Sequence, residues 1–266
     1  MTYGSKYWFS SEPGRTHDLV MRSAERKGFM RGKKKTLEIR KKLALACRIL
    51  YMEGLADFNL GHASSRVPDQ ENIFIKPGGL GLEEIKPEDL IVVDMGGNLL
   101  EGDHSPHGET PIHTEIYKMR KDVGSVVHVH PFFGTAFSAV RSEMKPLNQD
   151  GVLFPHGIPT LETPELITTR QQGQALAQIL GKGNALFLRN HGIVTVGKRI
   201  EEACLNALFL ERALRVTLIA SGFGEAEAIS EETALKMYAE CQSPKRYDMI
   251  WNYLVRKLGR EGLGFE

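Results

Sequence analysis

The heptapeptide SVVHVHP at residues 125–131 constrains the fold more than any other stretch of the chain. Branched residues around His128 favour a short buried β-strand, and Pro131 ends it because proline lacks the N–H that a strand ladder needs. Side chains two positions apart on a strand share one face of the sheet. His128 and His130 are therefore predicted to project together from one rigid element, as half of a divalent-metal site.

Length and composition limit what this chain can be. Its 266 residues can bury a full core, and 41% hydrophobic with 25% charged residues is ordinary for a soluble globular protein. A net charge of +1 argues against a nucleic-acid partner, because neutralising phosphates requires a basic face. No apolar run reaches the roughly 20 residues that span a bilayer. We therefore expect no membrane association.

The three cysteines are widely spaced and lack the CxxC pairing of a metal site. The N-terminus also lacks the apolar stretch of a signal peptide. These features predict reduced thiols in a cytoplasmic protein.

The chain divides into three expected parts. Residues 1–35 end in the basic run RGKKK and are predicted to form an N-terminal arm. Thr36 can cap a helix that runs to about Gly54 and begins the main domain, which is expected over residues 36–225. Residues 226–266 are predicted to form a helical extension that packs on the same domain.

After the first helix the pattern changes to short strands separated by glycine turns. The backbone amides near Gly78 and Gly79 could form an anion-binding nest, although most glycine turns only reverse the chain. Strands are predicted at residues 60–67, 73–76 and 90–94.

The densest cluster of acidic residues and histidines lies at residues 101–117. Thr110 followed by Pro111 is a favourable start for a helix. Glu109 then sits just before the helix N-terminus, where the dipole and free N–H groups favour a carboxylate. His113, one helical turn further, either orients Glu109 and lines the pocket or is a buried structural histidine.

A third histidine is held at another strand end. A buried strand at 185–188 runs into the sharp turn Arg189-Asn190-His191-Gly192, and a second strand leaves at 193. A turn between two strands is a rigid place for a ligand. Three imidazoles with the Glu109 carboxylate suit Zn²⁺, Mn²⁺, Fe²⁺ or Co²⁺, one ion per subunit, and the sequence does not choose among them.

Several ordered motifs together resemble the class II aldolase/adducin family, over roughly residues 36–225. They are GHxSxR at 61–66, IKPG at 75–78, KPEDL at 86–90, ExxxHxxxY at 109–117, HxH at 128–130 and NHG at 190–192.

The resemblance implies an α/β fold with three α/β/α layers and a central, mainly antiparallel sheet. It implies that His128, His130 and His191 bind a divalent metal, and that Glu109 is a catalytic carboxylate and possible fourth ligand. It also implies a homotetramer with active sites at subunit interfaces.

The sequence departs from the sugar-phosphate aldolases of this family at the positions that hold phosphate. His107-Gly108 stand where those enzymes place serines, and His62 stands where they place asparagine. Lys76 begins a loop that is rich in Thr and Ser in the aldolases. Loss of the hydroxyls disfavours a phosphorylated sugar, while His62, Lys76 and His107 still offer donors to an anion such as a carboxylate.

These differences favour the family's decarboxylase branch, which acts on hydroxylated aromatic or pyridine carboxylates and related hydroxy-keto acids. Glu109 and His113 are the expected catalytic residues, with the metal as Lewis acid. Asp150 is added as a third, because it lies in the region where the aldolases carry a proton-donating tyrosine. The small anionic substrate is expected to contact His62, Arg66, Lys76, Gly78, Gly79 and His107.

Three alternatives stay open at this point. The same metal site could cleave a sugar or sugar phosphate as an aldolase. Redox chemistry at Fe²⁺ is a second enzymatic alternative. An adducin-like scaffold without catalysis is an alternative of another class, and the joint presence of three histidines and Glu109 argues against it.

Overall fold

A mainly antiparallel sheet organises the structure, a computed structural model that describes residues 15–68 and 70–265, with side chains from Lys34 onward. Within these residues the strand order is β4-β3-β2-β1-β5-β8-β7-β6, and the β6–β7 pair is the parallel one. The strands are β1 (His62–Arg66), β2 (Asn72–Ile75), β3 (Ile91–Asp94), β4 (Leu99–Glu101), β5 (Ser125–Val129), β6 (Thr160–Leu161), β7 (Ala185–Leu188) and β8 (Gly192–Gly197).

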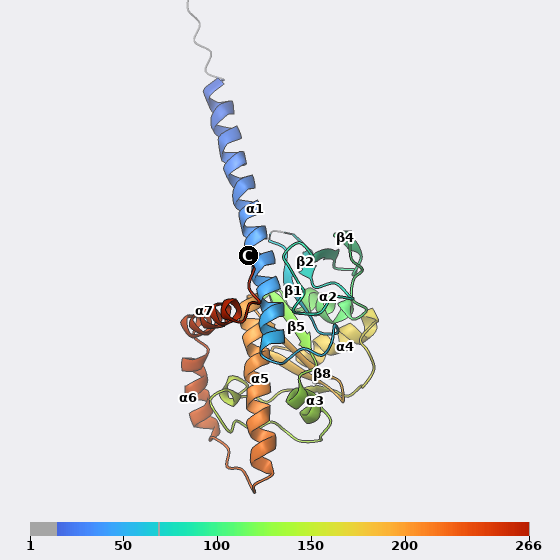
Figure 1. Cartoon of the computed structure of the whole chain (residues 1–266), viewed down its shortest axis with the longest axis vertical. Coiled ribbons are helices and arrows are strands. Elements are labelled where there is room, and N and C mark those ends of the chain that lie inside the picture. Colours follow the sequence, from blue (N-terminus) through green and yellow to red (C-terminus); the bar gives the residue numbers. More distant parts are fainter. Residues whose placement is uncertain (1–14, 69, 266) are drawn as a thin grey trace, which may run out of the picture.

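Helices cover both faces of this sheet (Figure 1). A single 3₁₀ turn, η1 (Gly151–Leu153), lies in the proline-rich connection. The α-helices are α1 (Arg15–Met52), α2 (Thr110–Met119), α3 (Phe132–Ser138), α4 (Arg170–Leu180), α5 (Ile200–Ser221), α6 (Glu231–Cys241) and α7 (Pro244–Arg260).

The predicted strand at 125–131 is the central strand β5, paired antiparallel with β1 and β8. Its alternating side chains divide the core. Val127 and Val129 pack in the cluster that contains α1, α5 and α7, whereas Val126 packs in the cluster that contains α2 and α4. The expected three-layer α/β/α fold is confirmed.

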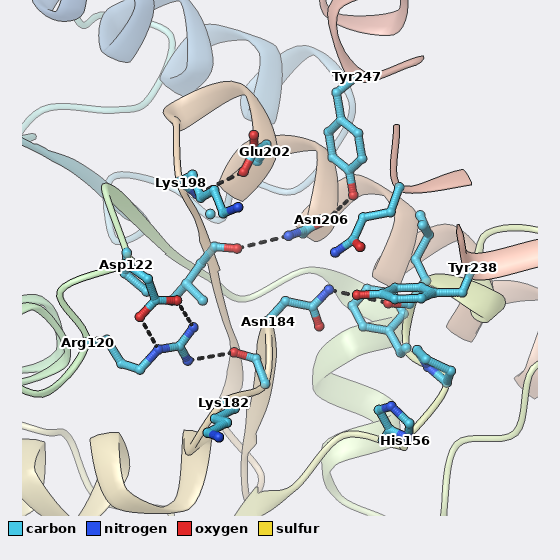
Figure 2. Close-up of a pocket in the computed structure, with 18 of the residues that line it drawn as sticks. Arg120, Asp122, His156, Lys182, Asn184, Lys198, Glu202, Asn206, Tyr238 and Tyr247 are labelled. Carbon is cyan, nitrogen blue, oxygen red and sulfur yellow. Dashed lines mark hydrogen bonds and ion pairs between the residues drawn. The ribbon is translucent and has the colours of Figure 1, made fainter. Parts of the chain in front are cut away.

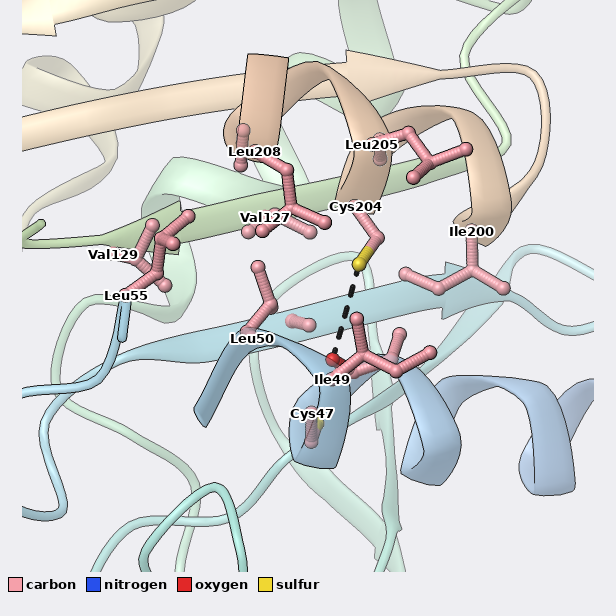
Figure 3. Close-up of a cluster of buried hydrophobic side chains, with 14 of the residues drawn as sticks. Cys47, Ile49, Leu50, Leu55, Val127, Val129, Ile200, Cys204, Leu205 and Leu208 are labelled. Carbon is pink, nitrogen blue, oxygen red and sulfur yellow. Dashed lines mark hydrogen bonds between the residues drawn. The ribbon is translucent and has the colours of Figure 1, made fainter. Parts of the chain in front are cut away.

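Close packing joins α1 to α5 over the same face of the sheet (Figure 3). Leu50 of α1 and Leu208 of α5 are buried in the same cluster, and Cys204 Sγ approaches Ala46 O at 3.9 Å. The predicted free thiols are found: Cys47 and Cys204 are buried and unpaired. These thiols serve packing, because burial raises the pKa of Cys47 to about 12 and so disfavours the reactive thiolate.

Helix α1 begins earlier than the sequence suggested. We expected a start at Thr36, but the helix runs without interruption from Arg15, and its first half projects away from the sheet (Figure 1). No proline interrupts residues 15–35, and Arg, Lys, Glu and Met there are good helix formers. Thr36 is therefore an interior residue of a helix. The first fourteen residues of the expected arm lie outside the described residues.

Helix α7 packs beside α1 and α5 (Figure 1). Trp251, Leu254 and Leu258 of α7 belong to the same buried cluster as α1 and α5. Arg48 of α1 donates to Leu263 O at 2.8 Å, which ties the last residues to the first helix. No helix in the described residues is long and apolar enough to cross a membrane.

Candidate metal centre

The register of the sheet brings the predicted ligands together at one end of the central strands. His128 lies opposite His62 of β1 and Val194 of β8 in the antiparallel ladders. His130 follows the end of β5, and His191 precedes β8, which pairs with β5 through Val129 and Ile193. The antiparallel strands β5 and β8 therefore present the three imidazoles at the same end of the pair.

The donor atoms of these three histidines and Glu109 all lie within 4.8 Å of one another. Glu109 Oε2 lies 3.6 Å from His128 Nε2 and 3.8 Å from His191 Nε2. The Nε2 atoms of His128 and His130 are 2.9 Å apart.

The hydrogen bonds of the Nδ1 atoms determine which nitrogen of His128 and of His130 carries the hydrogen. His128 Nδ1 is 2.9 Å from Ile193 O, and a carbonyl only accepts, so Nδ1 carries the hydrogen. His130 Nδ1 is 2.8 Å from Asp57 Oδ2, which favours a hydrogen there too. Both Nε2 atoms then present lone pairs to each other, an arrangement that suits a shared cation. The residues therefore fit a divalent metal.

Glu109 is held as an ionised carboxylate. It occupies the position before α2, is 3% exposed, and its Oε1 accepts from the Ile167 amide at 2.9 Å. Burial acts to raise the pKa of Glu109, but His128 and His62 beside it hold that pKa well below its usual range. One oxygen is thus fixed by the backbone while Oε2 faces the imidazoles.

Two further histidines line the site on the side of β1. His62, His107 and Glu109 form a second group of donor atoms within 4.8 Å of one another. His107 Nδ1 accepts from the Glu109 amide at 3.2 Å, and burial lowers the pKa of His107 to about 4. His113 is fully buried behind His62, with 2.6 Å between His113 Nε2 and His62 Nδ1.

Lys76 is a buried cation held only by backbone carbonyls in its immediate contacts. It has no exposed surface, and its ammonium donates to Asn59 O at 2.9 Å and Pro77 O at 3.2 Å. Burial lowers the pKa of Lys76. No carboxylate of the described residues lies within ion-pair distance of it. A buried charge of this kind is costly unless an anion arrives to pair with it.

The glycine turn next to Lys76 differs from the expected nest. The Gly78 amide donates to Ser105 O at 3.0 Å, so it is already occupied. Gly79 adopts φ +89°, a conformation that favours glycine, and has open space where a side chain would be. Gly79 therefore stays a candidate for close approach of a ligand, whereas the Gly78 N–H does not.

Two residues expected at the site lie elsewhere. Arg66 is at the opposite end of β1 from His62, and its guanidinium donates to Val123 O, Tyr117 O and Arg120 O. Asp150 precedes η1 and pairs with Arg212 at 2.9 Å. The structure does not bring either residue to the histidine cluster of the same protomer.

A separate cavity of about 460 Å³ opens at the other end of the central strands (Figure 2). Its wall contains Val123, Val196 and the Arg120–Asp122 ion pair. Tyr247 and Asn206 also line it, joined by a 2.8 Å hydrogen bond. None of the expected metal ligands lines this cavity.

Sequence reasoning missed two contributors to the site. Asp57, which contacts His130, lies 73 positions away from it in the chain and carried no signal of that contact. Ser64, whose Oγ lies 2.7 Å from His113 Nδ1, was detectable, because it is two residues from His62 and so shares its face of the strand.

Comparison with known proteins places these residues in context. Residues 41–218 match the family model described as Class II Aldolase and Adducin N-terminal domain. A 3,4-dihydroxyphthalate decarboxylase from Terrabacter sp. is 30% identical over 235 residues, covering 83% of this chain and 97% of the relative. An L-fuculose phosphate aldolase from Methanococcus maripaludis is 31% identical over 183 residues, covering 65% of this chain and 92% of the relative.

A solved structure has the same fold. The crystal structure of an aldolase II superfamily protein from Pseudomonas syringae superposes with a TM-score of 0.79 at 27% identity, covering 86% of this chain and 95% of that one.

Proposed function

The chain belongs to the class II aldolase and adducin family, and on this basis we propose that it is a divalent-metal-dependent carbon–carbon lyase. We further propose that it decarboxylates a hydroxylated aromatic or heteroaromatic carboxylate, or a related hydroxy-keto acid. The observation that carries the first proposal is the pair of facing Nε2 lone pairs of His128 and His130, beside His191 and Glu109.

His128, His130, His191 and Glu109 would hold the cation, with Zn²⁺ or Mn²⁺ as the expected ion and Fe²⁺ or Co²⁺ as further possibilities. When bound, the cation supplies Lewis-acid stabilisation of negative charge on a substrate oxygen. Glu109 is the group that moves a proton, because it is ionised, buried and next to that position. The Ile167 amide fixes its other oxygen and so orients the carboxylate.

Lys76 favours an anionic substrate, and its neighbours favour a carboxylate over a phosphorylated sugar. A fully buried ammonium without a carboxylate partner is stabilised when a substrate anion pairs with it. His107 and His62 add neutral donors on the same side, and no serine stands immediately before Glu109 to bind phosphate. A planar substrate with two acidic groups matches this set of donors. The decarboxylase relative, at 97% coverage of its own length, supports this choice.

Aldol cleavage of a sugar phosphate is the second candidate. The specific observation in its favour is the similarity to the L-fuculose phosphate aldolase. A panel of hydroxyaryl and pyridine carboxylates and sugar phosphates separates the two with the zinc- or manganese-loaded protein. Release of CO₂ supports the decarboxylase, and release of an aldehyde with no CO₂ from any acid contradicts it. Absence of stoichiometric metal would instead favour a non-enzymatic scaffold.

We also propose that the protein works as a homotetramer with the site at a subunit interface. Two aromatic side chains at the site are left uncovered: Phe58 is 90% exposed and Phe132 is 77% exposed. Phe58 follows Asp57, which contacts His130. Phe132 begins α3 two residues after His130. Exposed aromatics beside a site are typical of surfaces that a partner or a substrate covers. Light scattering of the purified protein tests the subunit count.

A further inference from the structure

A chain of short hydrogen bonds runs from His62 into the protein interior. His62 Nδ1 lies 2.6 Å from His113 Nε2. On the other side of that ring, His113 Nδ1 lies 2.7 Å from Ser64 Oγ, and Ser64 Oγ lies 2.8 Å from the Tyr117 hydroxyl. All four side chains are buried, and β1 and α2 supply two each.

Each of these contacts needs one hydrogen between its two heavy atoms, and Ser64 Oγ has no other partner in the described part of the protein to accept its own hydrogen. The hydrogen-bond chain therefore has two consistent arrangements. In the first, Tyr117 donates to Ser64, Ser64 donates to His113 Nδ1, and His113 Nε2–H donates to His62 Nδ1. His62 then carries its own hydrogen on Nε2. In the second, donor and acceptor exchange roles in every bond. Tyr117 must then donate to Gly124 O, and His62 Nε2 carries a lone pair and no hydrogen.

The inner end of the chain favours the first arrangement. Tyr117 Oη lies 3.5 Å from Gly124 O, at the limit of a hydrogen bond. That carbonyl already accepts from the Arg66 amide at 2.9 Å. The Ser64 oxygen, 2.8 Å away, is the better acceptor for the Tyr117 hydrogen.

The outer end of the chain favours the same arrangement. His62 Nε2 is buried, makes no hydrogen bond, and lies 3.9 Å from Glu109 Oε2. A lone pair on Nε2 would repel the carboxylate, whereas an N–H is attracted to it. We infer that Ser64, His113 and Tyr117 are positioning residues that fix His62 as a hydrogen-bond donor, with its hydrogen on Nε2 aimed into the substrate site.

The hydrogen-bond chain from Tyr117 to His62 holds a hydrogen in place and does not conduct protons. Burial raises the pKa of Tyr117 above its usual range and lowers that of His113 to about 3, so both stay neutral near pH 7. Tyr117 also has no exposed surface through which water could replace a lost proton. Because these side chains stay neutral and their hydrogen bonds all run in one direction, His62 keeps the same tautomer through each turnover.

The substrate side of this inference rests on the proposed function, because the Nε2–H then meets a carboxylate or oxyanion of the substrate. The reversed chain has a different consequence. A bare His62 Nε2, together with His107 and Glu109, would suit a second cation instead. The tautomer of His62 thus separates a substrate donor from an additional metal ligand.

Side-chain ¹⁵N spectra of zinc-loaded, histidine-labelled protein without substrate distinguish the two arrangements. The inference requires hydrogen on Nε2 in both His62 and His113, with signals assigned through His62→Asn and His113→Asn. Hydrogen on Nδ1 of either ring overturns it. Because the spectra need no turnover, they test the chain whether or not the protein proves to be a lyase. If no divalent metal binds, the proposed function fails, and the metal-free spectra still decide the tautomer.

Two variants test the role of the chain in the reaction. Ser64→Ala and Tyr117→Phe should each lower kcat/KM roughly 10- to 100-fold and increase the Nδ1–H fraction in the spectra. Tyr247→Phe is the matched control, because it also removes a buried hydroxyl, one that donates to Asn206 Oδ1 at 2.8 Å. Equal kinetic losses in all three variants, with unchanged histidine spectra, would contradict the inference.

Discussion

Asp57 Oδ2 lies 2.8 Å from His130 Nδ1, and this contact directs the other nitrogen of His130 toward His128 and Glu109. A carboxylate behind a ligating histidine fixes the ring and raises its basicity. Asp57 is half-buried in the loop before β1. This loop therefore orients His130, which follows β5.

Removal of the Asp57 carboxylate should weaken metal binding. We expect Asp57→Ala to lower zinc affinity roughly 10- to 100-fold, because His130 loses the partner that sets its tautomer. Competition with a chromophoric chelator measures the affinity. Asp122→Ala is the control, since Asp122 pairs with Arg120 at the other end of the sheet and should leave affinity unchanged. Equal affinities of Asp57→Ala and wild type would exclude this role.

Replacement of Lys76 should separate stability from activity. Lys76→Met keeps the length of the side chain and removes a buried charge, so the free energy of unfolding should rise by about 1–2 kcal/mol. Turnover of a carboxylate substrate should fall about 100-fold in kcat/KM, mainly through KM. Urea denaturation and steady-state kinetics measure the two effects. Lys182→Met, at an exposed lysine, should change neither; a destabilised Lys76→Met protein would argue against an unpaired buried charge.

Protonation of His113 should destabilise the fold in acid. Burial lowers the pKa of His113 to about 3, below its usual 6.5, so the unfolded chain binds more protons than the folded one between those values. Stability from this group is complete above pH 6.5 and is lost as pH falls toward 3. Unfolding free energies of the metal-free protein at several pH values should therefore drop in this window. His113→Asn should flatten the drop, and an unchanged slope would refute the assignment.

Gly192 should not tolerate a side chain. A Cβ there would lie 2.6 Å from Val129 O and 2.7 Å from His130 Cδ2, so the backbone or the imidazole must move. We expect Gly192→Ala to cost about 1–3 kcal/mol and to weaken zinc binding by displacing His130. Gly259→Ala meets nothing within 4 Å and serves as control. Thermal unfolding with and without zinc measures both effects; wild-type zinc affinity in Gly192→Ala would contradict the expectation.

Periodicity explains which parts of the site could be read from the sequence. Strand alternation placed His128 and His130 on one face, and the turn before Gly192 located His191 at a strand end. Arg66, expected at the site through the family motif, shares a face with His62 but lies four residues, about 13 Å, further along β1. Alternation identifies a face of a sheet but not the position along it.

Contacts between distant loops explain what could not be predicted. Asp57 reaches His130 because the loop before β1 packs at the end of β5, and no local pattern encodes that docking. Asp150 was placed by analogy with a family position, but η1 directs it to Arg212. The early start of α1 was missed because a good cap at Thr36 does not require a helix to begin there.

The central claim is that His128, His130, His191 and Glu109 share one cation. Anomalous diffraction from crystals grown with zinc, recorded on both sides of the zinc absorption edge, tests it most directly. The account predicts one strong peak per subunit, within about 2.0–2.3 Å of three imidazole nitrogens and a Glu109 oxygen. No peak at this position, or a peak bound by other residues, would contradict it.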